Sequence, residues 1–185
     1  MIREIVIFGD PVLRKKCAVV DEIADDLREL VQDMLETMRE ADGIGLAAPQ
    51  VGVAIQLAVM DVSHDPECFS YLRVDGRDTG LAEVMPLIFM NPKLEYGGDS
   101  DVLSEGCLSF PDIRGDVTRP NEVKATLDLL DGRSVVIETD GLLARVIQHE
   151  TDHLNGVLFV ERMSTATKLS LRGKIRRMQS DYRAN

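Results

Sequence analysis

The sequence predicts an α+β fold in which antiparallel β-sheets pack around a central helix that carries two histidines. Two periodicities support this prediction. Apolar residues recur at helical spacing over residues 23–41, and they alternate with polar residues over residues 123–137. That N-terminal amphipathic helix and a C-terminal helix complete the fold. Because 44% of the 185 residues are hydrophobic, a sizeable core is expected, and we predict a single domain over residues 1–185.

The first half of the chain is expected to contain one helix, two strands and a loop. The helix over residues 23–41 should end near Gly43, because glycine commonly follows the last helical turn. Residues 53–60 are almost entirely apolar and predict a buried strand. Residues 63–80 are polar and rich in Asp and Gly, which indicates a surface loop. A second strand is predicted over residues 84–90.

The second half should contain further strands followed by two helices. A strand is predicted over residues 101–108, and the alternating residues 123–137 surround an Asp-Gly turn, which is typical of a β-hairpin. Gly141 then opens the helix that carries the two histidines. The last helix is expected over residues 164–179, where the first residue, a serine, could cap the helix N-terminus.

Composition and charge limit the classes of function. A formal net charge of −11 argues against binding nucleic acid through the whole surface, and no specific DNA partner is expected. No apolar run approaches the length of a membrane span, and the N-terminus lacks the apolar core of a secretory signal, so we expect a cytoplasmic protein. Three cysteines form a poor disulfide framework, so reduced thiols are expected.

His149 and His153 lie four residues apart, with Glu150 beside the first of them. A helix turns by about 400° over four residues, so both imidazoles leave the same face and can reach one metal ion. Glu150 lies one step round the helix, where its carboxylate can exchange a proton with water. This spacing is typical of a hydrolytic metal site.

A catalytic site of this kind usually has three protein ligands and one open position. The remaining histidine, His64, stands in the polar segment and is expected to be solvated. Cys107 is the better candidate because thiolate is a strong, soft ligand. Although a cysteine taken alone is more often a small buried hydrophobe, the two-histidine helix favours the ligand. Cys17 and Cys68 are expected to be bystanders, although Cys68 could oxidise.

Residues 43–52 form a third informative segment, GIGLAAPQVG. Its glycines and small side chains let a backbone lie close to a ligand or to another strand, and Gln50 adds an amide that can donate a hydrogen bond. Taken alone, the segment equally suits a tight helix-to-strand connection. It lacks the lysine of a phosphate-binding loop.

Together, GIGLAAPQ, EGCLS and QHETDHLNG resemble the three signature motifs of the peptide deformylase family, in the same order and with fitting spacing. The resemblance covers almost the whole chain, including the turn at residues 10–14, although the segment 63–86 looks longer than in the shortest bacterial members. It implies removal of the N-formyl group from the formylmethionine of newly made polypeptides, which releases formate. It also implies one divalent metal ion, namely ferrous iron, with zinc, nickel or cobalt as substitutes.

The resemblance also implies roles for individual residues. The metal ligands would be Cys107, His149 and His153. The catalytic groups would be Glu150 as acid and base, and Gln50 and the backbone N–H of Leu108 as donors to the formyl oxygen. The substrate groove would be lined by Ile44, Gly45 and Arg114 along the peptide backbone, and by Glu105 and Leu142 around the methionine pocket.

Three charged residues near these motifs each have two interpretations. Glu105 could orient a metal ligand or pair with Arg119. Asp152 could support a ligand or be a solvated helix carboxylate. Arg145, one turn before His149, could reach the rim of the groove or face solvent.

Two other functions fit part of the pattern. A metallopeptidase with the same two-histidine helix commonly adds a further ligand downstream, and no histidine follows His153. A non-catalytic zinc module would need a fourth ligand to close the site.

Basic residues crowd near the C-terminus, at positions 168, 172, 174, 176 and 177. In some bacterial deformylases a C-terminal helix contacts the ribosome, and this cluster would suit RNA. A solvated basic face that balances an acidic protein is an equally good interpretation.

Overall fold

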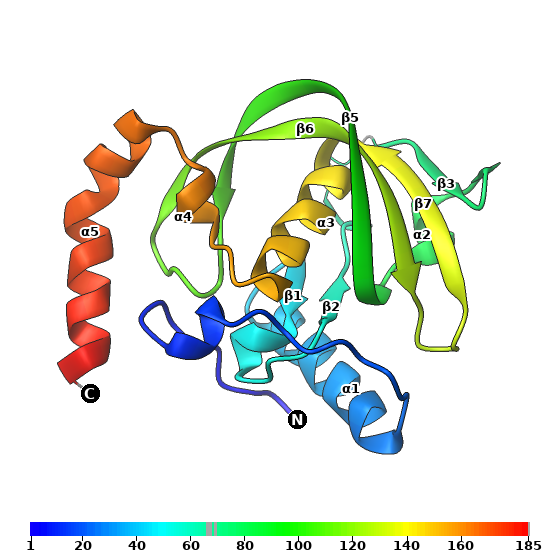
Figure 1. Ribbon diagram of the computed structural model, residues 1–185, viewed down its shortest axis with the longest axis horizontal. Coiled ribbons are helices and arrows are strands. Elements are labelled where there is room, and N and C mark those ends of the chain that lie inside the picture. Colours follow the sequence, from blue (N-terminus) through cyan, green and yellow to red (C-terminus); the bar gives the residue numbers. More distant parts are fainter. Residues whose placement is uncertain (66–67, 69, 185) are drawn as a thin grey trace.

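The computed structural model describes residues 1–65, 68 and 70–184. In this part of the chain, seven strands form one antiparallel sheet in the order β1-β2-β5-β6-β7-β3-β4. Its long central strands are β5 (Leu87–Gly106), β6 (Arg114–Asp128) and β7 (Ser134–Asp140). The sheet curls around helix α3 (Gly141–Leu154), which carries the two histidines (Figure 1). The predicted α+β class, with antiparallel strands around this helix, is confirmed.

Strands β1 (Gly45–Ala47) and β2 (Leu57–Met60) lie between two helices, with α1 (Asp25–Glu40) covering the face opposite α3. Successive side chains of a strand point to opposite faces, so both faces need apolar residues here. The side chains that pack with α1 are Leu46, Leu57 and Val59. Those that pack with α3 are Ala47, Ala58 and Met60. This double coverage explains the uninterrupted apolar run. The predicted strand at 53–60 is shorter than expected, because only its second half pairs with neighbouring strands.

Helix α1 has the boundaries expected of residues 23–41 to within two residues. Asp25 and Asp26 occupy its first turn, where carboxylates interact favourably with the helix dipole. The left-handed residue beyond its end is Asp42, with a φ of 52°, and not Gly43. The Gly43 N–H instead bonds to the carbonyl of Met38 at 2.9 Å and closes the last turn.

The two strands predicted over 84–90 and 101–108 are parts of the single strand β5. Its pairing with β6 continues through irregularities between Met90 and Lys93 and between Gly97 and Ser100. Neither boundary is as predicted. The predicted strand over 84–90 begins too early, because residues 81–84 form the short helix α2 (Leu81–Val84). The predicted strand over 101–108 ends too late, because pairing ends at Gly106.

The segment 63–80 is only partly the surface loop that its composition predicts. It contains the short strands β3 (Leu72–Val74) and β4 (Arg77–Asp78), and β3 extends the sheet beyond β7. These strands were missed because Asp75-Gly76 is a two-residue hairpin turn inside a polar stretch, where composition alone does not reveal pairing. Residues 66, 67 and 69 of the predicted loop lie outside the described residues. The hairpin predicted over 123–137 is confirmed as β6 and β7.

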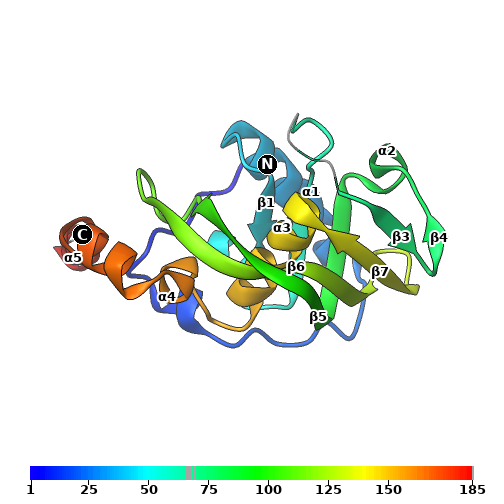
Figure 2. The ribbon, with the colours of Figure 1, turned by 90° about the horizontal axis from the view of Figure 1, so that it is seen from above.

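The chain ends in α4 (Phe159–Arg162) and α5 (Thr165–Ala184). Helix α5 lies along one side of the molecule (Figure 1), where it is seen end-on from above (Figure 2). The Ser164 hydroxyl accepts a hydrogen bond from the Thr167 N–H at 3.1 Å, so the predicted cap is confirmed. At the other end of α5, the Tyr182 hydroxyl donates to Asp10 at 2.9 Å, just before the 3-10 helix η1 (Pro11–Arg14). Among the described residues, no helix is both long and apolar enough to cross a membrane.

Candidate metal centre

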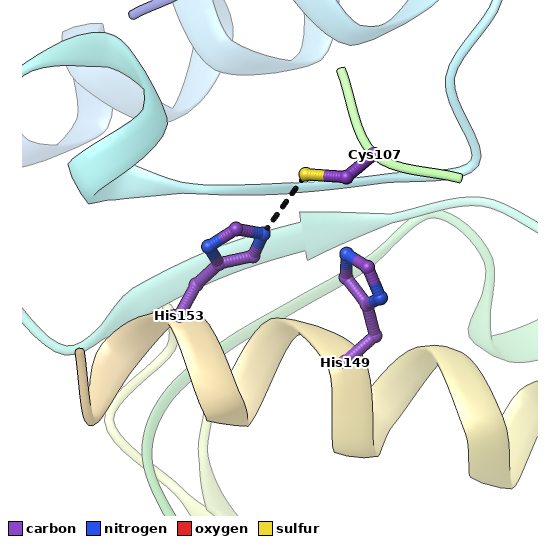
Figure 3. Close-up of side chains that lie close together, drawn as sticks. All are labelled: Cys107, His149 and His153. Carbon is purple, nitrogen blue, oxygen red and sulfur yellow. Dashed lines mark hydrogen bonds between the residues drawn. The ribbon is translucent and has the colours of Figure 1, made fainter. Parts of the chain in front are cut away.

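The two histidines of α3 and the cysteine that follows β5 meet at one point (Figure 3). Cys107 is the first residue after β5, so the end of this strand positions it beside the helix. Its Sγ lies 3.3 Å from Nε2 of His153, and one ligand atom from each of Cys107, His149 and His153 lies within 4.8 Å of the others. One thiolate and two imidazoles are donors that divalent transition metals accept. The structure thus places the three predicted ligands together.

Glu105 determines which nitrogen of His149 can face a metal ion. Oε2 of Glu105 lies 3.0 Å from Nδ1 of His149. Because an ionised carboxylate only accepts hydrogen bonds, Nδ1 carries a proton and Nε2 is the ring nitrogen left to face a metal ion. Ligating histidines usually have such a partner on their second nitrogen. The surroundings of His149 therefore fit a metal ligand.

Glu105 also pairs with Arg119, so both interpretations of this residue hold. The guanidinium of Arg119 grips the carboxylate at two points, Nε to Oε1 at 2.7 Å and Nη2 to Oε2 at 3.0 Å. Burial on its own would raise the pKa of Glu105, but hydrogen bonds from His149 and Arg119 hold this pKa far below its usual range. Glu105 is therefore ionised at any pH at which the protein works.

Asp152 is buried, and its interpretation as a solvated helix carboxylate is wrong. It accepts hydrogen bonds from Arg119 at 2.8 Å and from Arg162 at 2.6 Å. The same Arg119 also holds Glu105, which contacts His149. Asp152 therefore supports His149 indirectly, through Arg119 and Glu105. The second sequence interpretation, a partner that supports a ligand, describes it better.

Glu150 lies one residue from His149 and is 3% exposed. Burial raises the pKa of its carboxyl from the ordinary 4.5 to about 7, against the opposing influence of nearby positive groups. Gly45 makes room for this carboxylate, because a Cβ on Gly45 would lie 2.3 Å from Oε1 of Glu150. A group whose pKa lies close to neutral can both accept and return a proton.

Gln50 lies beside Cys107 in the 3-10 helix η2 (Ala48–Val51), and its amide orientation is fixed. Its Oε1 accepts the Ala47 N–H at 2.9 Å, which turns the Nε2 amide toward Sγ of Cys107 at 3.5 Å and Oγ of Ser109 at 3.2 Å. Gln50 is almost fully buried. The structure therefore places a fixed N–H donor next to the candidate ligand, and Leu108 follows that ligand directly in the chain.

The remaining predicted residues lie around this centre. Ile44 and Leu142 are partly buried against the core that contains α3. Arg114 is exposed and donates to the Ser104 carbonyl at 3.3 Å, across the strand pair that ends at Gly106. The contacts of Glu105 with His149 and two arginines account for both of its oxygens. Its predicted place at the methionine pocket, like those of Ile44 and Leu142, stays a prediction. His64 is exposed, as expected.

Sequence reasoning missed a row of three packed phenylalanine rings beside His149, here called the aromatic wall. Phe159 lies with its ring centroid 5.9 Å from that of His149, Phe110 packs on Phe159 at 5.2 Å, and Phe8 stacks on Phe110 at 4.6 Å. The backbone of the same N-terminal segment bridges two parts of the site, because Val6 and Phe8 donate to the carbonyls of Gln50 and Ser109. Only the apolar run at residues 5–8 hinted at this role.

Comparison with known proteins agrees with the geometry. The polypeptide deformylase family matches residues 2–169 of the chain. A peptide deformylase of Methylacidiphilum infernorum is 43% identical over 97% of this chain and 94% of its own length.

Solved structures give the same result. A peptide deformylase from Synechococcus elongatus in complex with actinonin is 42% identical, with a TM-score of 0.78 over 93% of this chain and 85% of that one. Peptide deformylase from Plasmodium falciparum is 34% identical, with a TM-score of 0.83 over 98% of each chain. The chain belongs to the peptide deformylase family.

Proposed function

We propose that Cys107, His149 and His153 hold one divalent metal ion, ferrous iron in the cell, and that the surrounding residues carry out the reaction of the family. As a member of that family, the chain is a metal-dependent hydrolase that removes the N-formyl group from newly made polypeptides. The observation that carries the proposal is the convergence of the three donor atoms within 4.8 Å, with the second nitrogen of His149 already bonded to Glu105. Zinc, nickel or cobalt would suit the same donors.

The bound metal would supply a Lewis acid that activates water and polarises a carbonyl. Glu150 would take the proton from the attacking water and pass it to the leaving amine, since its pKa of about 7 suits both steps. Negative charge develops on the formyl oxygen during attack. Gln50 Nε2 and the backbone N–H of Leu108 would stabilise that charge, and removal of one such donor typically costs on the order of 10² to 10³ in rate.

The substrate peptide would lie beside β1 and the end of β5. Gly45 and Ile44 would offer backbone groups to an extended chain, and Arg114 would lie further along it. Leu142 and Glu105 would lie at the methionine pocket. An extended peptide that pairs with an exposed strand gains main-chain hydrogen bonds without regard to its sequence, which suits an enzyme for many nascent chains.

Two further proposals concern the setting of the enzyme. Its substrates arise on ribosomes, so we place it in the cytoplasm, acting as one catalytic domain. The largely exposed helix α5 carries Lys168, Arg172, Lys174, Arg176 and Arg177, and such a helix could bind the ribosome through phosphates. Deleting residues 165–185 should then abolish co-sedimentation with ribosomes at low salt. If the truncated protein co-sediments as the full chain does, α5 is not the contact.

The activity is tested with formyl-Met-Ala-Ser under anaerobic conditions, by measuring formate release and metal content in the same sample. We expect formate release, no cleavage of an internal peptide bond, and loss of both metal and activity in Cys107→Ser. Cleavage of the internal bond would instead identify a metallopeptidase. Metal retained by Cys107→Ser would remove the cysteine from the ligand set.

A further inference from the structure

Arg145 lies one turn before His149 on α3 and is 6% exposed, so the interpretation that it faces solvent is wrong. Residues four apart on a helix share a face, and here both side chains reach the same carboxylate. Nη1 of Arg145 lies 2.7 Å from Oε1 of Glu105, while Nδ1 of His149 lies 3.0 Å from Oε2. Glu105 thus joins Arg145 to a candidate metal ligand.

Arg145 is also tied to the two long strands. Its Nη1 donates to the Val117 carbonyl of β6 at 3.0 Å. Its Nη2 contacts both the carbonyl, at 3.3 Å, and the carboxylate of Asp101 on β5. The planar guanidinium can make these bonds simultaneously, which a lysine cannot do. Arg145 therefore holds Glu105 in place relative to both strands and the helix.

The balance of charge explains why a second arginine is needed. Arg119 lies between two buried carboxylates, Glu105 and Asp152. Each of these is also paired with a further arginine: Asp152 with Arg162, and Glu105 with Arg145, which pairs with Asp101 as well. Without Arg145, Asp152 would still have two arginines, but Glu105 would have only Arg119, which it shares with Asp152. Removing one partner of a buried ion pair leaves an uncompensated buried charge, which is costly.

We infer that Arg145 is a positioning residue for the metal centre: it fixes the Glu105 carboxylate so that this carboxylate keeps its hydrogen bond with Nδ1 of His149 and the ring keeps Nε2 directed at the metal site. A buried arginine pair is not in itself a reason for stability, because apolar residues of similar volume often stabilise a core as well. Its value here is the fixed orientation of a ligand. The inference rests on the metal site proposed above.

The test measures Co²⁺ binding by the metal-free protein, through competition with a chelator and through the thiolate-to-cobalt absorption that reports Cys107. Loss of a residue that orients a ligand typically weakens metal binding about 10-fold to 100-fold. Arg145→Met, which keeps the apolar volume, should raise the Co²⁺ dissociation constant by about 10-fold or more. Arg145→Lys should raise it less. Arg133→Met removes an exposed arginine that pairs with Asp131, and it should leave the constant unchanged.

A double-mutant cycle separates positioning from a general structural role. If Arg145 acts through Glu105, Arg145→Met should add nothing to the weakened binding of Glu105→Gln, whereas independent structural damage would add fully. Folded Arg145→Met with wild-type affinity and absorption overturns the inference. If this variant does not fold, Arg145→Lys decides in the same way, with unchanged affinity overturning it. Wild-type protein without the thiolate absorption would refute the proposed metal site instead.

Discussion

Gly45 and Glu150 lie so close together that a single methyl group on Gly45 would come within 2.3 Å of the Glu150 carboxylate. The two residues come from β1 and α3, which are far apart in sequence and packed together in the fold. The other residue near this added methyl group would be Val146, whose Cγ1 lies 3.0 Å away on the preceding turn of α3. Absence of a side chain at Gly45 is thus what gives Glu150 its place.

Gly45→Ala should therefore impair turnover more than stability. The atom in the way is the end of the Glu150 side chain, which can move, so the protein should fold while the carboxylate is displaced. General acid and base catalysis contributes about 10² to 10⁴ in rate, and we expect kcat to fall within that range. Formate release and metal content should be measured together, with metal content unchanged.

Gly97→Ala is the matched control for that substitution. A Cβ at Gly97 would meet its nearest neighbour, Glu122, at 3.4 Å, an ordinary contact distance. Its kcat should match that of the unmodified enzyme. Full activity in Gly45→Ala would contradict the expected dependence of turnover on the position of the Glu150 carboxylate.

The pKa of Glu150 predicts a pH-dependent stability of the metal-free protein. The pKa is about 7 in the folded chain and 4.5 ordinarily, so the folded state binds the proton more tightly. The contribution of Glu150 to the free energy of unfolding is therefore lost as pH rises from about 4.5 to 7, by about 3 kcal/mol at about 1.36 kcal/mol per pH unit. Urea unfolding of the chelator-treated protein at a series of pH values, compared with a variant that lacks this carboxyl, measures the contribution.

Glu150→Gln isolates that contribution because glutamine does not titrate. The difference in unfolding free energy between Glu150→Gln and the unmodified chain should grow with pH over the same window. A difference that stays constant from pH 4.5 to 7.5 would contradict the raised pKa.

The candidate metal ligands could be predicted from sequence because their chemistry is encoded locally or by rare residue types. The four-residue spacing of His149 and His153 fixes a shared helix face whatever the fold. Cys107 was favoured because thiolate is a strong, soft ligand and because the EGCLS segment that carries it resembles a motif of the family. The alternating residues of β6 and β7 likewise revealed their hairpin because one face is buried.

Other features depend on pairings that no local pattern records. The continuity of β5 depends on β6 running beside it past two irregularities, so its sequence resembles two strands and a break. Arg145 looks like an ordinary charged helix residue until the strand carrying Glu105 is placed against α3. The aromatic wall joins Phe8 to Phe159, at opposite ends of the chain.

The three cysteines should differ in their reactivity toward iodoacetamide. Burial raises the pKa of Cys17 to about 11, so its thiol is protonated near neutral pH as well as shielded. Partly buried Cys68 should react first in the metal-loaded protein, and Cys107 should become reactive only after chelation. Peptide mapping by mass spectrometry at pH 7.5 measures this order. Rapid alkylation of Cys17 in the folded protein would contradict it.

Gly156 should be far more sensitive to substitution than Gly132, although both adopt the left-handed conformation with φ of 72° and 86°. A Cβ on Gly156 would lie 2.5 Å from the backbone carbonyl oxygen of Arg14, an atom that cannot turn away, whereas a Cβ on Gly132 meets nothing within 4 Å. Gly132→Ala should cost about 1 to 2 kcal/mol, the strain of a left-handed residue. Gly156→Ala adds a backbone clash, so about 3 kcal/mol or more is expected. Urea denaturation gives both values. Equal losses would show that the contact between η1 and the end of α3 yields easily.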